Sequence, residues 1–231
     1  MTNSNVSLDD KYSIESGRIF VTGVQALARI PMVQRQRDVS EGLNTAGFIS
    51  GYRGSPVGGF DQQLWRAKKF LEQNHIRFQP GLNEDLAASA IWGSQQTNLH
   101  EGGKYDGVFA IWYGKGPGVD RCGDVFKHGN MSGPAKHGGV LLIAGDDHAA
   151  KSSTVPHQSE YAFMDASIPV LNPAGLQDIV DYGILGFAMS RFSGCWVAFK
   201  TTAENMDSSA SIDVSPDRVK ISLPKFDMPE V

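Results

Sequence analysis

Short apolar runs alternate with longer amphipathic segments along most of this chain, and this alternation limits the folds that are open to it. The most apolar run, residues 139–145, has no polar side chain between its two flanking glycines. Such continuous runs are typical of strands that are buried on both faces of a parallel sheet. Strands that alternate with helices at this spacing predict a doubly wound, mostly parallel α/β sheet with helices on both faces.

The alternation predicts six strands with helices between them. The expected strands are residues 46–52, 75–80, 107–113, 139–145, 168–171 and 195–200. The expected helices lie near residues 60–74, 84–100 and 120–131, with residues 114–118 as a glycine-rich loop. A further helix is expected to start at Asn172 and Pro173, because a capping residue followed by proline is a common helix start. Apolar spacing in residues 20–45 predicts a helix that is interrupted at Pro31.

Composition excludes several classes of partner and site. The net charge of -4 gives no basic surface for nucleic acid or an anionic membrane. The two cysteines, Cys122 and Cys195, have neither a disulfide framework nor the spacing of a zinc or iron–sulfur site. The first residues lack a basic start and an apolar signal segment, and no run of 18 apolar residues occurs. We therefore expect a cytoplasmic protein.

The chain divides into three parts by composition. Residues 1–18 are a polar lead-in, and residues 19–203 carry the α/β pattern. Residues 204–231 are rich in Ser, Asp and Pro and have little apolar periodicity, which is typical of a linker. We expect this last part to lead toward further domains, so that the chain is a fragment of a larger protein.

One carboxylate, Glu84, lies at a predicted junction between a strand and a helix. Such junctions lie at the carboxyl ends of parallel strands, where α/β proteins bind their ligands. Glu84 is therefore a candidate functional residue. In the alternative interpretation, Asn83 caps the helix and Glu84 only complements the helix dipole.

The other loops after the strands are rich in Gly, Ser and charge, and they are expected to gather at one edge of the sheet. They match no phosphate-binding fingerprint, since GxxxxGK[ST] is absent and residues 114–118 lack GxGxxG spacing. Neither Ser55 nor Ser153 lies in a GxSxG nucleophile elbow. The acidic and histidine residues of the later loops are ambiguous between metal ligands and hydrogen-bond acceptors for the backbone; they are Asp146, Asp147, His148, His157 and Glu160.

Four of these loops together resemble a known family. They are residues 51–56, Asn83 and Glu84, the segment from Gly145 to Ser153, and residues 171–173. In order and spacing they are similar to the N-terminal region of indolepyruvate ferredoxin oxidoreductase, in its long single-chain form. That region is the pyrimidine-binding domain of a thiamine-diphosphate-dependent 2-oxoacid oxidoreductase. The resemblance covers about residues 20–203.

The resemblance implies a role for each matching residue. Glu84 matches the glutamate that hydrogen-bonds the pyrimidine ring nitrogen and assists proton transfer, and is the implied catalytic residue. Gly54, Ser55, Gly114 and Gly116 are implied to lie against the cofactor. Ser55 stands where related pyruvate enzymes have a threonine near the substrate carboxylate, and it is implied to contact the substrate with Arg53. Arg53 departs from the commoner proline of this loop.

The resemblance also implies what the chain lacks. No Gly-Asp-Gly segment followed by Asn is present to hold Mg²⁺, and no cysteine-rich segment is present for [4Fe-4S] clusters. The chain is thus expected to be half of a site, inactive alone and completed by a diphosphate-binding domain or subunit. The complete enzyme is expected to be a homo-oligomer that oxidises a 2-oxo acid, such as the aryl-pyruvate indolepyruvate, to an acyl-CoA. Its electrons would pass to ferredoxin.

Two other interpretations stay open at this point. The chain is a self-contained nucleotide- or flavin-binding α/β module in one, and the missing fingerprints count against it. In the other it is a non-catalytic pairing domain that uses the same fold as an interaction surface.

Overall fold

The apolar strands form a six-stranded, wholly parallel sheet in the computed structural model, which describes residues 6–225. Across the sheet the strand order is β3-β2-β4-β5-β7-β6. The strands are β2 (Ala46–Gly51), β3 (Ile76–Phe78), β4 (Val108–Lys115), β5 (Val140–Asp146), β6 (Val170–Leu171) and β7 (Val197–Thr202). The predicted parallel α/β class is confirmed.

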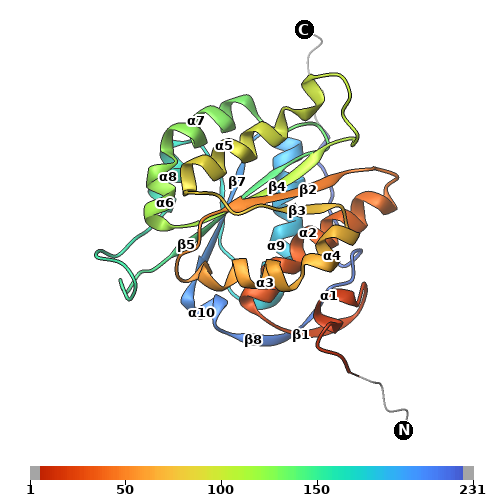
Figure 1. Ribbon diagram of the computed structural model, residues 1–231, viewed down its shortest axis with the longest axis horizontal. Coiled ribbons are helices and arrows are strands. Elements are labelled where there is room, and N and C mark those ends of the chain that lie inside the picture. Colours follow the sequence, from red (N-terminus) through yellow and green to blue (C-terminus); the bar gives the residue numbers. More distant parts are fainter. Residues whose placement is uncertain (1–5, 226–231) are drawn as a thin grey trace.

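Helices cover both faces of this sheet (Figure 1). On one face lie α2 (Gly23–Ser40), α3 (Phe60–Arg66), α4 (Lys68–Gln73) and α9 (Leu176–Ser193). On the other face lie α5 (Glu84–Gln95), α6 (Gly116–Arg121), α7 (Gly123–Ser132) and α8 (Glu160–Asp165). Two short helices, α1 (Asp10–Ser13) and α10 (Ala203–Met206), and 3₁₀ turns at Val57–Gly59 and Thr97–Leu99 complete the helices of the described residues.

Alternate residues of the central strands supply the two cores. In β4, Ile111 and Tyr113 face the core under α2 and α9, whereas Ala110 and Trp112 face the core under α5 and α7. All four side chains are fully buried. Because side chains alternate along a strand, a continuous apolar run supplies both cores at once.

Two segments outside the predicted pattern pair with each other. Strand β1 (Arg18–Thr22) is antiparallel to β8 (Ser209–Asp213) and forms a separate two-stranded sheet, at the bottom of Figure 1. The segment expected as a linker from residue 204 therefore contains structure in its first part. Its local apolar pattern is weak because Ile212 is the one fully buried residue of β8. The strand with which β8 pairs, β1, is also far away in sequence.

The expectation that the early helix is interrupted at Pro31 is wrong. Helix α2 begins at Gly23 and continues through Pro31 to Ser40. Proline removes one helical hydrogen bond and clashes with the preceding turn. Here α2 packs closely on α9, since a Cβ added at Gly183 would lie 2.7 Å from the Ile30 side chain. This tertiary packing stabilises the helix despite the proline.

Two predicted connections also differ. Helix α9 begins at Leu176 after Gly175, and not at Asn172 and Pro173, because Asp178 accepts a hydrogen bond from the Gly175 main-chain nitrogen at 3.1 Å. The expected loop at residues 114–118 is not a loop. Strand β4 continues to Lys115, and α6 begins directly at Gly116.

Within residues 6–225, no helix is long and apolar enough to span a membrane.

Candidate functional site

The strand order creates a topological switch point at the carboxyl ends of β2 and β4. The connection that follows β2, through α3 and α4, packs on one face of the sheet, and the connection that follows β4, through α6 and α7, packs on the other. Open α/β sheets bind ligands where the connections that follow adjacent strands leave toward opposite faces in this way. The same divergence recurs between β5, followed by α8, and β7, followed by α10.

Glu84 is the first residue of α5, as the sequence predicts. The Asn83 side chain caps the helix by accepting a hydrogen bond from the Leu86 main-chain nitrogen at 2.8 Å. The Trp112 indole nitrogen donates to the Glu84 carbonyl oxygen at 3.0 Å. The cap and the tryptophan together fix the start of α5 against β4.

The Glu84 carboxylate is enclosed but is not engaged by hydrogen bonds. Its side chain is 15 % exposed, and one carboxylate oxygen lies 3.9 Å from the Arg121 guanidinium. A Cβ added at Gly118 in α6 would lie 2.4 Å from the Glu84 Cγ, so the glutamate packs directly on this glycine. Among the described residues no hydrogen bond ends on the carboxylate. It is therefore available as an acceptor.

Cys122, which follows Arg121, is not an activated thiol. Burial raises the pKa of the Cys122 thiol far above its usual range, and the negative charges of Asp85 and Glu84 raise it further. A thiol in this state is a weak nucleophile.

The loop after β2 carries three of the predicted site residues at the same edge of the sheet. Arg53 and Ser55 are exposed there, and Gly54 is half-buried. A Cβ added at Gly54 would lie 2.9 Å from the Lys115 Cβ at the end of β4, so the loops after the two strands touch. The cationic and hydroxyl groups of this loop face solvent.

The other two predicted glycines, Gly114 and Gly116, make room for protein side chains. A Cβ at Gly114 would lie 2.5 Å from the Trp112 ring, and one at Gly116 would lie 2.2 Å from the His157 ring. Both glycines are buried. The lack of a side chain at these positions is thus explained by internal packing, and their contact with a cofactor stays a prediction.

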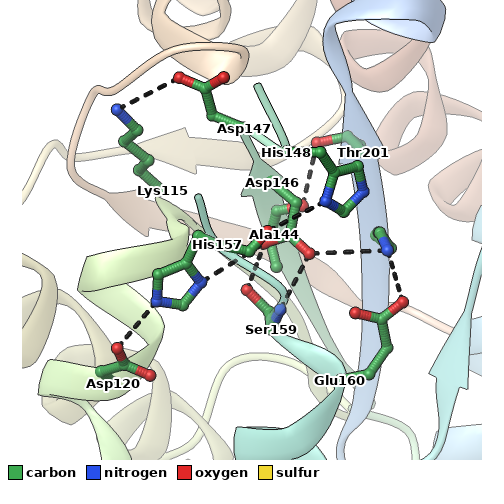
Figure 2. Close-up of polar contacts among 11 residues, drawn as sticks. Lys115, Asp120, Ala144, Asp146, Asp147, His148, His157, Ser159, Glu160 and Thr201 are labelled. Atoms are coloured by element: carbon green, nitrogen blue, oxygen red, sulfur yellow. Dashed lines mark hydrogen bonds and ion pairs between the residues drawn. The ribbon is translucent and has the colours of Figure 1, made fainter. Parts of the chain in front are cut away.

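A second group of charged residues surrounds the carboxyl ends of β5 and β7 (Figure 2). Asp146 accepts hydrogen bonds from the Ser159 main-chain nitrogen at 2.9 Å and from its hydroxyl at 2.5 Å. Lys200 lies 3.7 Å from Asp146 and donates to Glu160 at 2.5 Å. Burial raises the pKa of Glu160, but the hydrogen bond and charge of Lys200 outweigh it and hold the pKa below its usual value.

Sequence reasoning missed this group because its members come from distant segments. The sequence alone leaves the roles of Asp146, His157 and Glu160 ambiguous. It gives no motif that points to Asp120 or Lys200. Asp120 and His157 are 37 positions apart, as Glu160 and Lys200 are 40 apart. The one local signal is Lys200, a lysine that directly follows the apolar run 195–199.

Asp147 shapes its own loop. It accepts hydrogen bonds from the Ser152 and Lys151 main-chain nitrogens at 2.8 and 3.0 Å, and these bonds hold its pKa below the usual value. Lys115 lies 3.8 Å away and donates to the Ser152 carbonyl oxygen at 2.6 Å. In the part of the chain that the structure describes, no three His, Cys, Asp or Glu residues are grouped to hold a metal ion. Asp147 was ambiguous between a metal ligand and a hydrogen-bond acceptor for the backbone, and its bonds to the main chain of Lys151 and Ser152 fit the second interpretation.

Comparison with known proteins finds this fold in a solved enzyme structure. No protein-family model and no curated protein sequence matches this chain. Among solved structures, it is similar to 2-oxoglutarate:ferredoxin oxidoreductase from Magnetococcus marinus, determined with 2-oxoglutarate, coenzyme A and succinyl-CoA bound. The TM-score is 0.68 at 14% sequence identity, over 93% of this chain and 35% of that chain. The chain therefore spans about a third of that enzyme's length. At this identity the likeness shows a shared fold.

Proposed function

We propose that this chain is the pyrimidine-binding half of a thiamine-diphosphate-dependent 2-oxoacid:ferredoxin oxidoreductase. The observation that carries the proposal is the Glu84 carboxylate, which is largely buried at the start of α5 and accepts no hydrogen bond among the described residues. The fold that holds it is shared with an oxidoreductase of this class.

The chemistry of the Glu84 carboxylate fits the pyrimidine ring of thiamine diphosphate. A ring N–H needs an acceptor, and an ionised carboxylate is an acceptor only. Glu84 would hold that ring through one carboxylate oxygen, with Gly118 and Arg121 keeping the side chain in place. When bound, the cofactor would supply a carbon nucleophile for a 2-oxo carbonyl. Glu84 supplies general acid–base assistance to the ring.

Ser55 and Arg53 are the proposed substrate contacts. Both are exposed on the loop that follows β2, at the same edge of the sheet as the start of α5. A guanidinium and a hydroxyl suit the carboxylate of a 2-oxo acid. The aromatic ring of Tyr52 is 41% exposed beside them, which supports an aryl-pyruvate such as indolepyruvate as the substrate.

A second domain or subunit is proposed to cover this edge. Large apolar residues are exposed on the loops and the helix start at the carboxyl ends of the strands; they are Tyr52 at 41%, Leu82 at 85%, Leu86 at 53% and Val155 at 58%. Exposed apolar side chains that gather on one surface mark an interaction site. The partner would hold the diphosphate through Mg²⁺, and other parts of the oligomeric enzyme would hold [4Fe-4S] clusters and bind coenzyme A and ferredoxin.

The test is turnover by the protein expressed from its complete reading frame, with any separately encoded partner subunit present. We expect 2-oxo-acid-dependent reduction of a one-electron acceptor that requires both added thiamine diphosphate and coenzyme A. Indolepyruvate, pyruvate and 2-oxoglutarate would be compared as substrates. The isolated 231-residue chain should be inactive.

Two outcomes would overturn the proposal. Turnover that does not depend on thiamine diphosphate would contradict it. Tight binding of FMN or NAD by the isolated chain, with no effect of thiamine diphosphate, would instead support a self-contained nucleotide- or flavin-binding module.

A further inference from the structure

A cavity of about 590 Å³ lies beside β3, the strand at one edge of the parallel sheet. Residues of α3 and α4 line it on one side, and β3 and the segment before β4 line it on the other. Figure 1 shows α4 next to β3. The cavity shares no residue with the candidate site around Glu84. Small-molecule pockets usually measure about 300–1,000 Å³, so the cavity has the size of a ligand site.

Aromatic rings line this cavity from several segments of the chain. Trp65 of α3 and Phe78 of β3 pack edge to face, with ring centroids 4.9 Å apart. Tyr105, which precedes β4, packs in the same manner on His75 at 5.8 Å, and its hydroxyl lies 3.1 Å from the His75 Nδ1. Trp65 is nevertheless 51% exposed. About half of this large apolar surface is therefore open to a further planar group.

The charged side chains of the cavity leave one cation unpaired. Lys68 and Glu72 lie one turn apart in α4 and form an ion pair at 3.8 Å. Arg77 of β3 also lines the cavity and is exposed. Within residues 6–225 its guanidinium has no hydrogen bond or ion pair. Because a guanidinium can bind a carboxylate through two parallel N–H···O bonds, the cavity has a free anion-binding group beside its aromatic wall.

A role of Arg77 in protecting the sheet edge does not explain this arrangement. Charged side chains on edge strands prevent sheets from joining edge to edge, and β3 is an edge strand. That role needs neither a cavity nor an aromatic wall, and a half-exposed tryptophan beside the edge works against it. Apolar walls that hold a ligand and a few polar groups that orient it are typical of a binding site.

We propose that this cavity binds a small aromatic carboxylate. The aromatic ring of the ligand would lie against Trp65 and Phe78, and its carboxylate would accept hydrogen bonds from Arg77. An anion is favoured over a cation because Lys68 already neutralises the Glu72 carboxylate. The site needs neither thiamine diphosphate nor a partner domain, so the inference does not depend on the proposed function.

The test titrates the 231-residue chain, without thiamine diphosphate, with phenylacetate, a probe that carries both a ring and a carboxylate. Isothermal titration calorimetry measures the dissociation constant. The indole N–H resonances of the tryptophans show where the probe binds, with the fully buried Trp112 and Trp196 as reference signals. Two control ligands are acetate, which lacks the ring, and phenethylamine, which carries a positive charge in place of the carboxylate.

We expect phenylacetate to shift the Trp65 resonance saturably, with a dissociation constant below about 1 mM. Both control ligands should bind about tenfold more weakly or worse. Arg77→Gln should weaken phenylacetate binding by about tenfold or more, because it removes a charge-assisted hydrogen bond. Arg66→Gln is the matched control and should bind as the wild type does, since Arg66 is an exposed arginine of α3 that does not line the cavity.

Three results would overturn the inference. They are the absence of a saturable Trp65 shift at millimolar phenylacetate, equal binding of phenethylamine, and equal affinities of Arg77→Gln and Arg66→Gln. If Arg77→Gln aggregates because the sheet edge has lost its charge, Trp65→Ala replaces it as the test, with calorimetry as the readout. This variant loses the open aromatic surface and should also bind more weakly by about tenfold. An unchanged affinity in Trp65→Ala would equally overturn the inference.

Discussion

At the scale of single residues, the candidate site depends on close contact between Glu84 and a glycine. A side chain at Gly118 would displace Glu84, because its Cβ would lie 2.4 Å from the Glu84 Cγ. The sequence predicted correctly that a helix starts at Glu84 with Asn83 as its cap, since both follow local rules of helix starts. It gave no sign of the Gly118 contact, which joins two helices that are distant in sequence.

We predict that Gly118→Ala lowers thiamine-diphosphate-dependent turnover. The added methyl must displace the Glu84 side chain, at a cost of about 1–3 kcal/mol for overpacking. The gain in helix propensity, about 1 kcal/mol, offsets part of this cost, so the loss should be larger in turnover than in stability. Gly123→Ala is the control, because nothing lies within 4 Å of its added Cβ. Equal turnover of the two variants would contradict the prediction.

At the scale of elements, α5 is the helix that presents Glu84. Its start is set by the Asn83 cap and by the Trp112 hydrogen bond, whereas its small residues Ala87 and Ala88 pack on the sheet. The sequence predicted this helix and most strand positions, because apolar periodicity is a local property. It misplaced the starts of α6 and α9. Those starts depend on packing of His157 on Gly116 and on the Asp178 hydrogen bond to Gly175.

Asn83→Ala should destabilise this helix start. Loss of an N-cap side chain costs about 1 kcal/mol, and the first turn that carries Glu84 should fray. Urea unfolding and hydrogen exchange in the first turn of α5 would measure the change. Asn83→Ser, which keeps a capping oxygen, should stay within a few tenths of a kcal/mol of the wild type. A larger loss in the serine variant would show that the asparagine acts in another way.

At the scale of the whole molecule, a buried ion pair joins the two long helices at the end of the sheet opposite the candidate site. Arg191 of α9 makes two contacts with Asp38 of α2, at 2.7 and 2.9 Å, and the Asp38 side chain is 1% exposed. The sequence predicted the sheet class but neither the strand order nor the β1–β8 pair. Long-range pairings of this kind leave no local pattern.

Arg191→Met should lower the free energy of unfolding by about 3–5 kcal/mol, because it leaves a buried carboxylate without its cation. The control is Lys68→Met, which removes an exposed pair with Glu72 whose side chains are both more than half exposed. Exposed pairs of this kind contribute about 1 kcal/mol or less. Urea denaturation of both variants measures the difference. Similar losses of unfolding free energy in the two variants would show that the buried Arg191 pair contributes no more than an exposed one.

Stability should fall in acid. The pKa values of Asp147, Glu160 and Asp213 are held below their usual values, mainly by hydrogen bonds that the ionised carboxylates accept, with Lys200 acting on Glu160. Groups with lowered pKa stabilise the fold above their unfolded values, about 3.9 for Asp and 4.3 for Glu, and lose this contribution as the pH falls through the folded values. Urea midpoints should therefore decrease from about pH 5 downward. A flat profile in that range would contradict these shifts.

The central claim is that Glu84 assists proton transfer on a bound thiamine diphosphate, and exchange of the cofactor C2 hydrogen with deuterium measures this most directly. In the complete protein, Glu84→Gln should retain the cofactor but slow the exchange by about 10²–10⁴-fold, the usual value of general acid–base assistance. Asp85→Asn is the matched control, since its side chain points about 100° away around the helix. It should exchange at nearly the wild-type rate. Equal, wild-type exchange in both variants would show that Glu84 only begins a helix.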